Sequence, residues 1–454
     1  MNNNANKHSI EYRQNTAYLN RTGLQSLMEK AMGYPLVIVH AAAGYGKTYT
    51  VNSFLEKSDA IVSWMQISER DNLTMRFWEY FTHMISLSWP KIGSRLAEIG
   101  FPETNEAFKR FMTMLQEIIS PSEKFVIVFD DFHLIYNPAI VDFIERMADS
   151  LPENAMIMLL SRTAPKINVS GDERSRVFTI EEDSLRFTKE EVAVYISQTA
   201  RHITSSTIQT IYDDTNGLAL AVNLIGQSLT KTVSYERYLA SEMEGGITKL
   251  IENEIFQTIS EPLRRFLLRI SLIDHRASSL VNVLAREMLL IKEMELLNDH
   301  MRYDFCLDAY LINRLFLEYL QQKQHILTDK ERYDTYQEAG AWCENNNFYT
   351  DALYYYEKSG DYDSVMRIIA HFRYPISQDV AKHTLMMIDR IPESVLFSNS
   401  LFPFIYMKLE TGINRFDGLP VHMRECVKGY EIWSEYQAET TFSRGFSTIG
   451  RFYG

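Results

Sequence analysis

The sequence predicts a multi-domain protein in which an N-terminal α/β domain is followed by helical domains. Between about Gly33 and Ile180, short apolar runs of strand length alternate with longer amphipathic stretches, and beyond Ile180 the strand signal fades. The chain has 454 residues, which is room for about three domains at ~150 residues each. We therefore expect one α/β domain and at least two helical ones.

Five apolar runs have the length of buried strands and are rich in Val, Ile, Phe or Met: Leu36–His40, Ala60–Gln66, Phe125–Phe129, Ala155–Ser161 and Val177–Ile180. Helix-like segments lie between them, including Met75–Ser86, Asn105–Ile119 and Ile140–Leu151. Nearly continuous apolar strands that alternate with helices indicate a parallel sheet covered by helices on both faces.

Helix signals dominate the chain after this region. Thr188 and Glu191 have the spacing of a capping box that opens a helix. Asn216-Gly217 is typical of a helix end, and Gly245-Gly246 predicts a linker. Ser260-Glu261-Pro262 predicts the start of another helix.

From Thr328 onward the pattern is again helical. Ala341-Trp342, Ala352–Tyr356 and Gly360-Asp361-Tyr362 fall where a helix–turn–helix repeat of about 34 residues places its small and aromatic packing residues. The run Tyr354-Tyr355-Tyr356 could stack on a carbohydrate, but at helical spacing we expect it to fill the repeat core.

Composition excludes several classes of protein. The net charge is −13, which disfavours a body that mainly binds nucleic acid. The three cysteines are far apart, which argues against a disulfide scaffold or a cysteine-built zinc site. No apolar run has the roughly 20 residues that a membrane helix needs, and residues 1–20 lack the apolar core of a secretory signal. We expect a cytoplasmic protein without a membrane partner, with residues 1–20 as a disordered tail.

The strongest motif is a phosphate-binding loop. Ala41 to Thr48 nearly match G-x-x-x-x-G-K-[ST], with Ala41 in place of the first glycine. Such a loop wraps phosphates with backbone N–H groups at a helix N-terminus, with Lys47 reaching the β- and γ-phosphates and Thr48 binding Mg²⁺. The predicted phosphate-binding residues are Ala43, Gly44, Tyr45, Gly46, Lys47 and Thr48. A glycine turn that binds no ligand remains the alternative.

Two of the predicted strands are followed by charged residues: Asp130 and Asp131 come after Phe125–Phe129, and Arg162 comes after Ala155–Ser161. Asp130 is placed to hold the Mg²⁺, and Asp131 to polarise an attacking water. On its own such an Asp often caps the next turn. Arg162 follows the run that ends at Ser161 and could bind the γ-phosphate; a solvated arginine at a strand end is an equal alternative. His133 is expected to have a structural role.

Together these motifs resemble those of the signal-transduction ATPases with numerous domains (STAND), in particular the bacterial regulators typified by the maltose-regulon activator, the large ATP-binding LuxR-type regulators. The residues that carry the resemblance are Gly44-Tyr45-Gly46-Lys47-Thr48, Trp64 with Asp71-Asn72, Phe77-Trp78 and Tyr80, Asp130–Ile135, Leu159–Arg162, Leu185–Thr188 and Thr215-Asn216-Gly217.

The resemblance implies a P-loop nucleotide-binding domain at 21–185, a helical lid at 186–245, a winged-helix domain at 246–327 and TPR-like helical repeats at 328–454. It implies a switch that binds ATP or ADP with Mg²⁺, hydrolyses ATP slowly and self-associates in response to a small-molecule or protein inducer. Family members end in a LuxR-type DNA-reading segment that residues 395–454 do not show. We therefore expect a truncated repeat region and no direct DNA binding by this chain.

The chain departs from the family pattern at two positions. Ala219 stands where related switches often have a proline, and Asn313 where a histidine usually contacts the phosphates. An amide there can hydrogen-bond but brings no positive charge. Arg21 lies where the family's N-terminal segment approaches the nucleotide, although we expect it to be an ordinary surface arginine.

Two alternatives to a hydrolysing switch remain. One is a catalytically degenerate module that holds a nucleotide structurally while its helical part binds a partner. The other is a metabolic kinase, which would need a basic substrate-binding lid that the helical half of the sequence does not offer.

Overall fold

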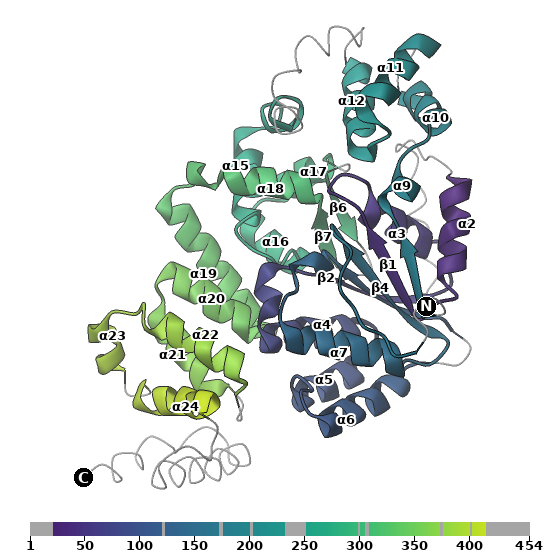
Figure 1. The fold of residues 1–454 in the computed structure, drawn as a ribbon. Coiled ribbons are helices and arrows are strands. Elements are labelled where there is room, and N and C mark those ends of the chain that lie inside the picture. Colours follow the sequence, from purple (N-terminus) through teal and green to yellow (C-terminus); the bar gives the residue numbers. More distant parts are fainter. Residues whose placement is uncertain are drawn as a thin grey trace, which may run out of the picture. The chain divides into compact units, whose positions relative to one another are not determined.

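The computed structural model describes most of the chain, and Figure 1 shows its fold. The described residues are 21–119, 123–171, 176–199, 203–231, 251–297, 300–304, 308–372, 376–399 and 402–414. The expected N-terminal tail, the Gly245-Gly246 linker and the segment after residue 414 lie outside them.

A five-stranded sheet forms the centre of the N-terminal region. Its order is β2-β3-β4-β1-β5 and its pairings are parallel. The strands are β1 (Leu36–His40), β2 (Ile61–Gln66), β3 (Phe125–Asp130), β4 (Ala155–Ser161) and β5 (Val177–Ile180). These bounds confirm the predicted parallel sheet and differ from the predicted runs by at most one residue at an end.

Helices cover both faces of the sheet (Figure 1). Val126 and Val128 of β3 share one core with Met28 of α2 and Val51 of α3. Phe129, which points to the other face, stacks on Phe81 of α4. The helices packed with Val126 and Val128 are α2 (Thr22–Ala31) and α3 (Lys47–Leu55). The helices on the side of Phe129 are α4 (Thr74–Ser88), α5 (Pro90–Ile99), α6 (Asn105–Gln116) and α7 (Pro138–Ser150). Burial on both faces explains why the strands are apolar without alternation.

A small helical cluster follows the sheet. Its core contains Val192, Ile196, Ile211 and Val222, and its helices are α9 (Glu182–Leu185), α10 (Lys189–Thr199), α11 (Ser205–Thr215) and α12 (Ala219–Lys231). The predicted capping box is present, because the Glu191 carboxylate accepts from the Thr188 N–H and the Thr188 hydroxyl accepts from the Glu191 N–H.

Four α-helices, two short helical turns and an antiparallel hairpin come next in the described part of the chain. The elements are η3 (Glu252–Phe256), α15 (Glu261–Ile270), α16 (Ser278–Ala285), α17 (Met288–Glu295), β6 (Met301–Asp304), β7 (Ala309–Ile312), α18 (Arg314–Gln322) and η4 (Gln324–Ile326). As predicted, α15 starts after Ser260, whose hydroxyl accepts from the Leu263 N–H.

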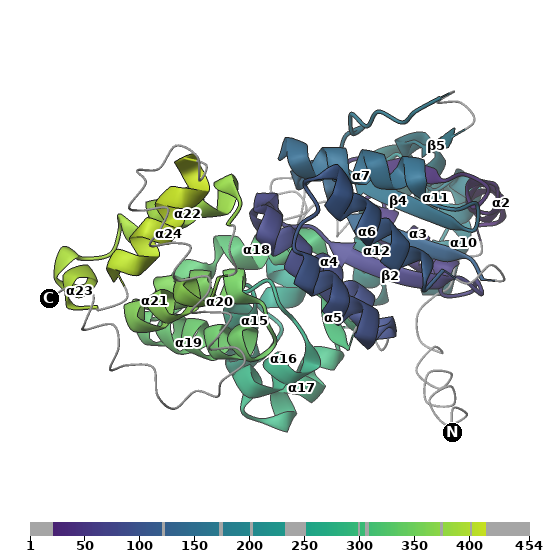
Figure 2. The same ribbon diagram turned by 90° about the horizontal axis from the view of Figure 1, so that it is seen from below.

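The described chain divides into two compact units. Among the described residues, the first unit comprises those within 21–72 and 80–331, and the second comprises Leu73–Glu79 and those within 332–414. Most of the second unit is helical (Figure 2), with α19 (Asp329–Asn345), which begins just before the boundary, α20 (Tyr349–Ser359), α21 (Tyr362–His371), α22 (Gln378–Ile388), α23 (Glu393–Ser398) and α24 (Phe402–Asn414). Gly340 of α19 packs against the Tyr356 ring of α20, where a Cβ would come within 2.9 Å of the ring.

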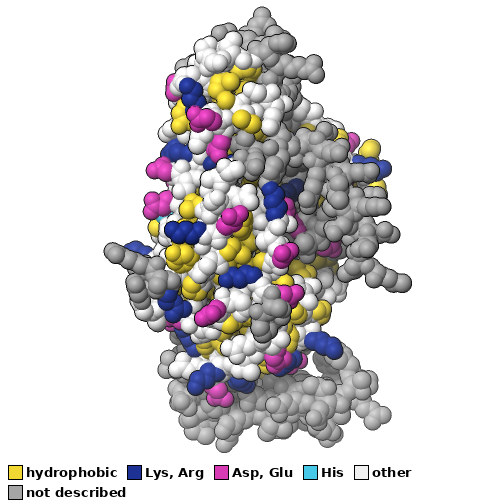
Figure 3. Space-filling model, turned by 90° about the vertical axis from the view of Figure 1, so that its right-hand side faces the viewer, with side chains coloured by type: hydrophobic (Ala, Val, Ile, Leu, Met, Phe, Trp, Pro, Cys, Tyr) yellow, Lys and Arg dark blue, Asp and Glu magenta, His cyan; other side chains and the backbone are white. Residues whose placement is uncertain are grey.

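Two properties of the described residues bear on partners. No helix among them has the length and apolar character that crossing a membrane requires. On the face that Figure 3 shows, basic and acidic side chains are interspersed rather than gathered into one basic area.

A buried ion pair lies inside the second unit. The Arg76 Nε is 2.7 Å from Asp351 Oδ1, and the two side chains are 2% and 0% exposed. Both charges have left water, so their mutual attraction offsets part of the cost of burying them.

We predict that Arg76→Met strongly destabilises the second unit, because it removes the guanidinium that pairs with the buried Asp351 carboxylate. The free energy of unfolding should fall by about 3–5 kcal/mol, measured by urea denaturation. The matched control is Arg390→Met. Arg390 likewise pairs with a carboxylate, that of Glu357, but its side chain is 60% exposed. Similar losses for the two variants would contradict the importance of burial.

Candidate nucleotide-binding site

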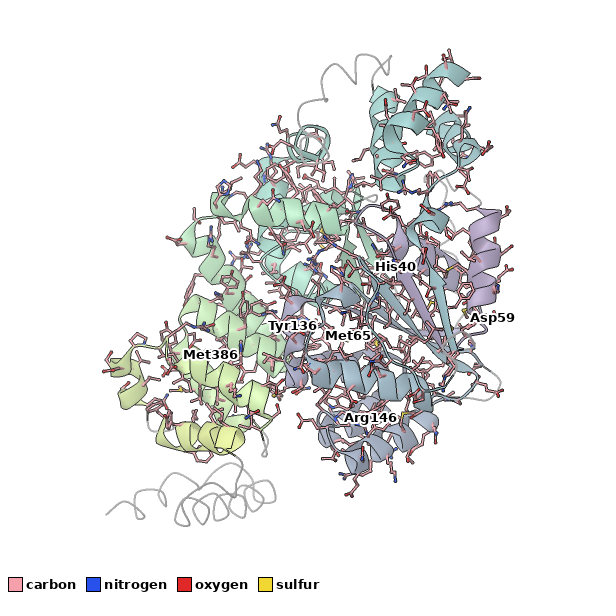
Figure 4. All side chains as sticks on the ribbon, viewed as in Figure 1. His40, Asp59, Met65, Tyr136, Arg146 and Met386 are labelled. Carbon is pink, nitrogen blue, oxygen red and sulfur yellow. The ribbon has the colours of Figure 1, made fainter. Side chains whose placement is uncertain are left out.

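The loop between β1 and α3 has the backbone conformation of a tight phosphate-binding turn. Gly44 and Gly46 have φ angles of 89° and 76°, in the region that glycine enters without steric cost. Gly46 is the N-cap of α3, which begins at Lys47. Figure 4 labels His40, the last residue of β1, where the loop leaves the sheet. The positive end of the α3 dipole therefore faces the space enclosed by the loop.

Lys47 is folded back over this loop. Its Nζ donates to the carbonyl oxygens of Ala41 at 2.7 Å and Ala42 at 3.0 Å. The side chain is buried, and burial lowers its pKa, against the attraction of Asp130 and Asp131. The structure thus holds a poorly hydrated cation beside the loop, and such a cation attracts an anion more strongly than a hydrated one does.

Thr48 and Asp130 are in direct contact. The Thr48 hydroxyl donates to Asp130 Oδ2 at 2.8 Å. The Asp130 carboxyl is buried at the end of β3, and burial together with the charge of Asp131 raises its pKa to about 7, although the Thr48 hydrogen bond opposes the shift. A hydroxyl and a carboxyl group that are 82 residues apart in sequence therefore meet at the N-terminus of α3.

Asp131 follows in a left-handed conformation, with φ of 57°. This turn redirects the chain after β3, so that Asp130 and Asp131 present their carboxyl groups at the same end of the sheet. The Asp131 carboxyl is nearly buried. His133 Nδ1 lies 3.9 Å from Asp131 Oδ1 and has no hydrogen-bond partner within the described structure.

Arg162 reaches the same site from β4. The register pairs His40 with Ser161, and the Ala41 N–H donates to the Ser161 carbonyl at 3.2 Å, so Arg162 begins beside the loop. Its charge contributes to lowering the Lys47 pKa. The guanidinium is 29% exposed and pairs with Glu318 at 2.5 Å. Arg162 is therefore partly buried and paired with a carboxylate, and it is not the solvated arginine at a strand end that we considered as the alternative.

The α12 helix contacts the loop from the other side. The Leu220 N–H donates to the Gly44 carbonyl at 3.0 Å, and a Cβ on Gly44 would lie 3.3 Å from Leu220 Cβ. Burial and the neighbouring Glu182 raise the pKa of Tyr45, and the Glu182 carboxylate accepts from the Ala42 N–H at 3.2 Å. The small helical cluster therefore closes directly over the loop.

Arg21 is not the ordinary surface residue that we expected. Its side chain is 13% exposed, and its Nε donates to Glu191. The two terminal nitrogens donate to the carbonyl oxygens of Leu185 and Arg186, and the guanidinium lies over the Phe187 ring. Arg21 ties the segment before α2 to the chain that leads into α10, at a point next to the loop. This contact could not be predicted from the sequence, because the partners of Arg21 lie far from it along the chain.

Asn313 acts as a helix cap. Its side-chain oxygen accepts from the N–H groups of Leu315 and Phe316 at the start of α18. The next residue, Arg314, extends toward the site, with Nη1 4.0 Å from Asp131 Oδ2. Neither Arg314 nor Glu318 carried a sequence signal, because each lies on an ordinary amphipathic helix far along the chain from β3 and β4.

Sequence comparison finds similar proteins among bacterial regulators. The chain is 23% identical over 392 residues to the HTH-type transcriptional regulator MalT of Vibrio parahaemolyticus, covering 84% of this chain and 43% of that protein. It is 22% identical over 440 residues to MalT of Vibrio campbellii, covering 92% of this chain and 48% of that protein. The chain thus spans about half the length of these curated relatives. No protein-family model matches it.

Structure comparison finds a similar fold in a signal-transduction ATPase with numerous domains, described as having a tetratricopeptide repeat sensor, from Pyrococcus horikoshii. The TM-score is 0.59 at 16% identity, over 92% of this chain and 62% of that one. The two comparisons confirm the predicted resemblance to MalT-like STAND P-loop ATPases.

We predict that Gly217→Ala disturbs the closure of the helical cluster over the loop. Gly217 has φ of 69°, and a Cβ there would overlap the Phe187 carbonyl oxygen. The matched control is Gly360→Ala, where φ is 75° and a Cβ would meet nothing within 4 Å. The control should lose only the backbone cost of about 1–2 kcal/mol.

Urea denaturation should show a larger loss for Gly217→Ala than for Gly360→Ala, and only the former should weaken nucleotide binding. Equal losses, with nucleotide affinity unchanged in both variants, would show that the contact with Phe187 does not position the cluster.

Proposed function

Starting from this likeness to MalT-like STAND P-loop ATPases, we propose that the chain is a nucleotide-dependent switch that binds ATP or ADP with Mg²⁺ at the loop from Ala41 to Thr48. The observation that carries the proposal is the 2.8 Å contact between Thr48 Oγ1 and Asp130 Oδ2 beside the buried Lys47. A glycine turn without a ligand gives no reason for burying an amine and a carboxyl pair at the same helix N-terminus.

The residues at this point suit Mg²⁺. The ion prefers oxygen ligands and is commonly held by one or two protein groups together with substrate phosphates. Thr48 and Asp130 supply two such oxygens. The described residues contain no cluster of three or more His, Cys, Asp or Glu side chains that could hold a metal alone, so the nucleotide would complete the ligand set. Bound there, Mg²⁺ would neutralise charge on the β- and γ-phosphates.

The loop itself would bind the phosphates. Ala43, Gly44, Tyr45 and Gly46 provide backbone N–H groups around the enclosed space. Lys47 would give up its contacts with the Ala41 and Ala42 carbonyls for the more strongly charged phosphate oxygens.

Asp131 and Arg162 would serve the terminal phosphate. In our proposal the Asp131 carboxylate orients and polarises the attacking water, and the Arg162 guanidinium binds the γ-phosphate. Both come from the carboxyl ends of neighbouring strands, where ligands of open parallel sheets bind.

The remaining regions would couple this site to a signal. We propose a nucleotide-binding domain at 21–185, a helical lid at 186–245, a winged-helix domain at 246–327 with the hairpin β6-β7 as its wing, and TPR-like repeats from 328. Slow ATP hydrolysis would be coupled to self-association in response to a small-molecule or protein inducer, within a cytoplasmic regulator of transcription whose DNA contacts are not made by these domains.

A catalytically degenerate module is the second candidate. Ala41 replaces the first loop glycine, Ala219 opens α12 in place of a proline, and Asn313 uses its side-chain oxygen to cap α18. A purified protein that carries ADP and shows no turnover under saturating ATP and Mg²⁺ would favour this candidate; sustained hydrolysis would exclude it.

We predict that Lys47→Ala removes measurable ATP and ADP binding, because the loop loses the cation that faces the phosphates. Titration with a fluorescent nucleotide analogue in the presence of Mg²⁺ measures the affinity. Lys109→Ala, which removes an exposed lysine of α6, is the control and should bind as the unchanged chain does. Unchanged affinity in Lys47→Ala would rule out this loop as the binding site.

We predict that Asp131→Asn keeps nucleotide binding and lowers ATP hydrolysis by about 10²-fold or more, because an amide cannot polarise the water as a carboxylate does. Asparagine tolerates the left-handed conformation of this position, so the turn should be preserved. Phosphate release under saturating ATP measures the rate. Asp142→Asn, at a 62% exposed aspartate, is the control; equal turnover in the two variants would remove Asp131 from its proposed role.

A further inference from the structure

The α18 helix brings two charged side chains to the phosphate end of the candidate site. Glu318 Oε1 accepts from Arg162 Nη2 at 2.5 Å and from Arg314 Nε at 3.0 Å. Arg314 also lies 4.0 Å from Asp131 Oδ2. A single carboxylate oxygen of Glu318 therefore links Arg162, which follows β4, to Arg314 of α18. Arg314 in turn approaches Asp131, which follows β3.

This linkage lies inside the first unit and is partly withdrawn from solvent. The side chains of Arg162, Glu318 and Arg314 are 29%, 31% and 31% exposed. Burial by itself would raise the pKa of Glu318, but the hydrogen bonds from the two arginines outweigh it and hold the pKa below its usual value. Glu318 is thus a carboxylate at neutral pH.

Arg162 is close enough to the loop for its charge to act there. Arg162 directly follows Ser161, which pairs with His40 and accepts a hydrogen bond from the Ala41 N–H, and its charge contributes to depressing the pKa of Lys47. Its partner Glu318 also binds Arg314, which lies 4.0 Å from Asp131, so the arginine belongs to the edge of the site where we propose that the terminal phosphate binds. A guanidinium presents its donors in a fixed plane, and a phosphate and a carboxylate compete for the same donors.

We propose that Glu318 sets the preference of this site for nucleoside diphosphate over triphosphate. While it is paired with Glu318, Arg162 is withheld from a γ-phosphate, and the Glu318 charge repels that phosphate. A diphosphate, which does not reach so far, is bound by Lys47 and the loop without this conflict. Glu318 is a positioning residue that acts through Arg162, and the inference rests on the proposed function.

Glu318→Gln tests the inference. The substitution keeps the size of the side chain but removes its charge, so Arg162 becomes available to the γ-phosphate. The ratio of the ATP to the ADP dissociation constant should fall by about tenfold, the effect of one charge-assisted hydrogen bond. Displacement of a fluorescent nucleotide analogue by ATP and by ADP, each with Mg²⁺, measures the two constants on the full chain.

Glu331→Gln is the matched control. Glu331 accepts from Arg265 Nε at 2.7 Å and Nη2 at 2.6 Å, so this variant breaks a similar Arg–Glu pair of the first unit that includes neither Arg162 nor Arg314. It should leave the ratio of the two dissociation constants unchanged. A shift of the ratio in Glu331→Gln as large as that in Glu318→Gln would overturn the inference, since the effect would then be one of general loosening.

A double-mutant cycle shows whether Glu318 acts through Arg162. In an Arg162→Gln background, adding Glu318→Gln should no longer lower the ATP to ADP ratio by the same factor. A full tenfold effect in that background would overturn the proposed route. If Glu318→Gln does not fold, Glu318→Asp lengthens the contact with Arg162 and should shift the ratio in the same direction by a smaller factor; a folded Glu318→Asp with an unchanged ratio would contradict the inference.

The measurements separate this inference from the proposed function. If the unchanged chain binds neither nucleotide, the proposed function fails. If it binds both and Glu318→Gln alters the two affinities equally or not at all, only the role of Glu318 fails.

Discussion

The candidate site depends on the pairing of β4 between β1 and β3. This order places three strand ends side by side at one edge of a parallel sheet: the phosphate loop after β1, Arg162 after β4 and the aspartates after β3. The hydrogen bond from Thr48 to Asp130 then spans the edge. Because the carboxyl ends of parallel strands lie at the same edge of the sheet, residues that follow different strands can reach one small ligand.

Charge at this edge is balanced by groups from three parts of the first unit. The loop and the strands contribute Lys47, Asp130 and Asp131, while α18 contributes Arg314 and Glu318. Burial alone would make the charged forms of Lys47 and Asp130 costly, as the directions of their pKa shifts indicate. In the proposed function, a bound polyphosphate with its cation would change this balance, and α18 would be the element through which the change reaches the helical part of the first unit.

Much of the α/β domain was predictable because its signals are local. Strand lengths, the loop spacing and the two aspartates are read from short stretches of chain, and β1, β4 and β5 have the predicted bounds. The capping box at Thr188 and the helix start at Ser260 are likewise decided within a few residues. Arg21 was wrongly expected to be an ordinary surface residue because its partners lie more than 160 residues away.

Local spacing was enough to indicate a phosphate-binding loop, a strand that ends in carboxylates and helices that follow. The folded chain alone decides which distant side chains share the site. Arg162 and Glu318, 156 residues apart, meet only because α18 packs at the edge of the sheet. Asn313 uses its amide oxygen for the helix cap, and Arg314 beside it extends toward Asp131. The physical reason is that a helix can be recognised from its own period and caps, whereas the direction of one charged residue on it is set by the packing of the whole domain.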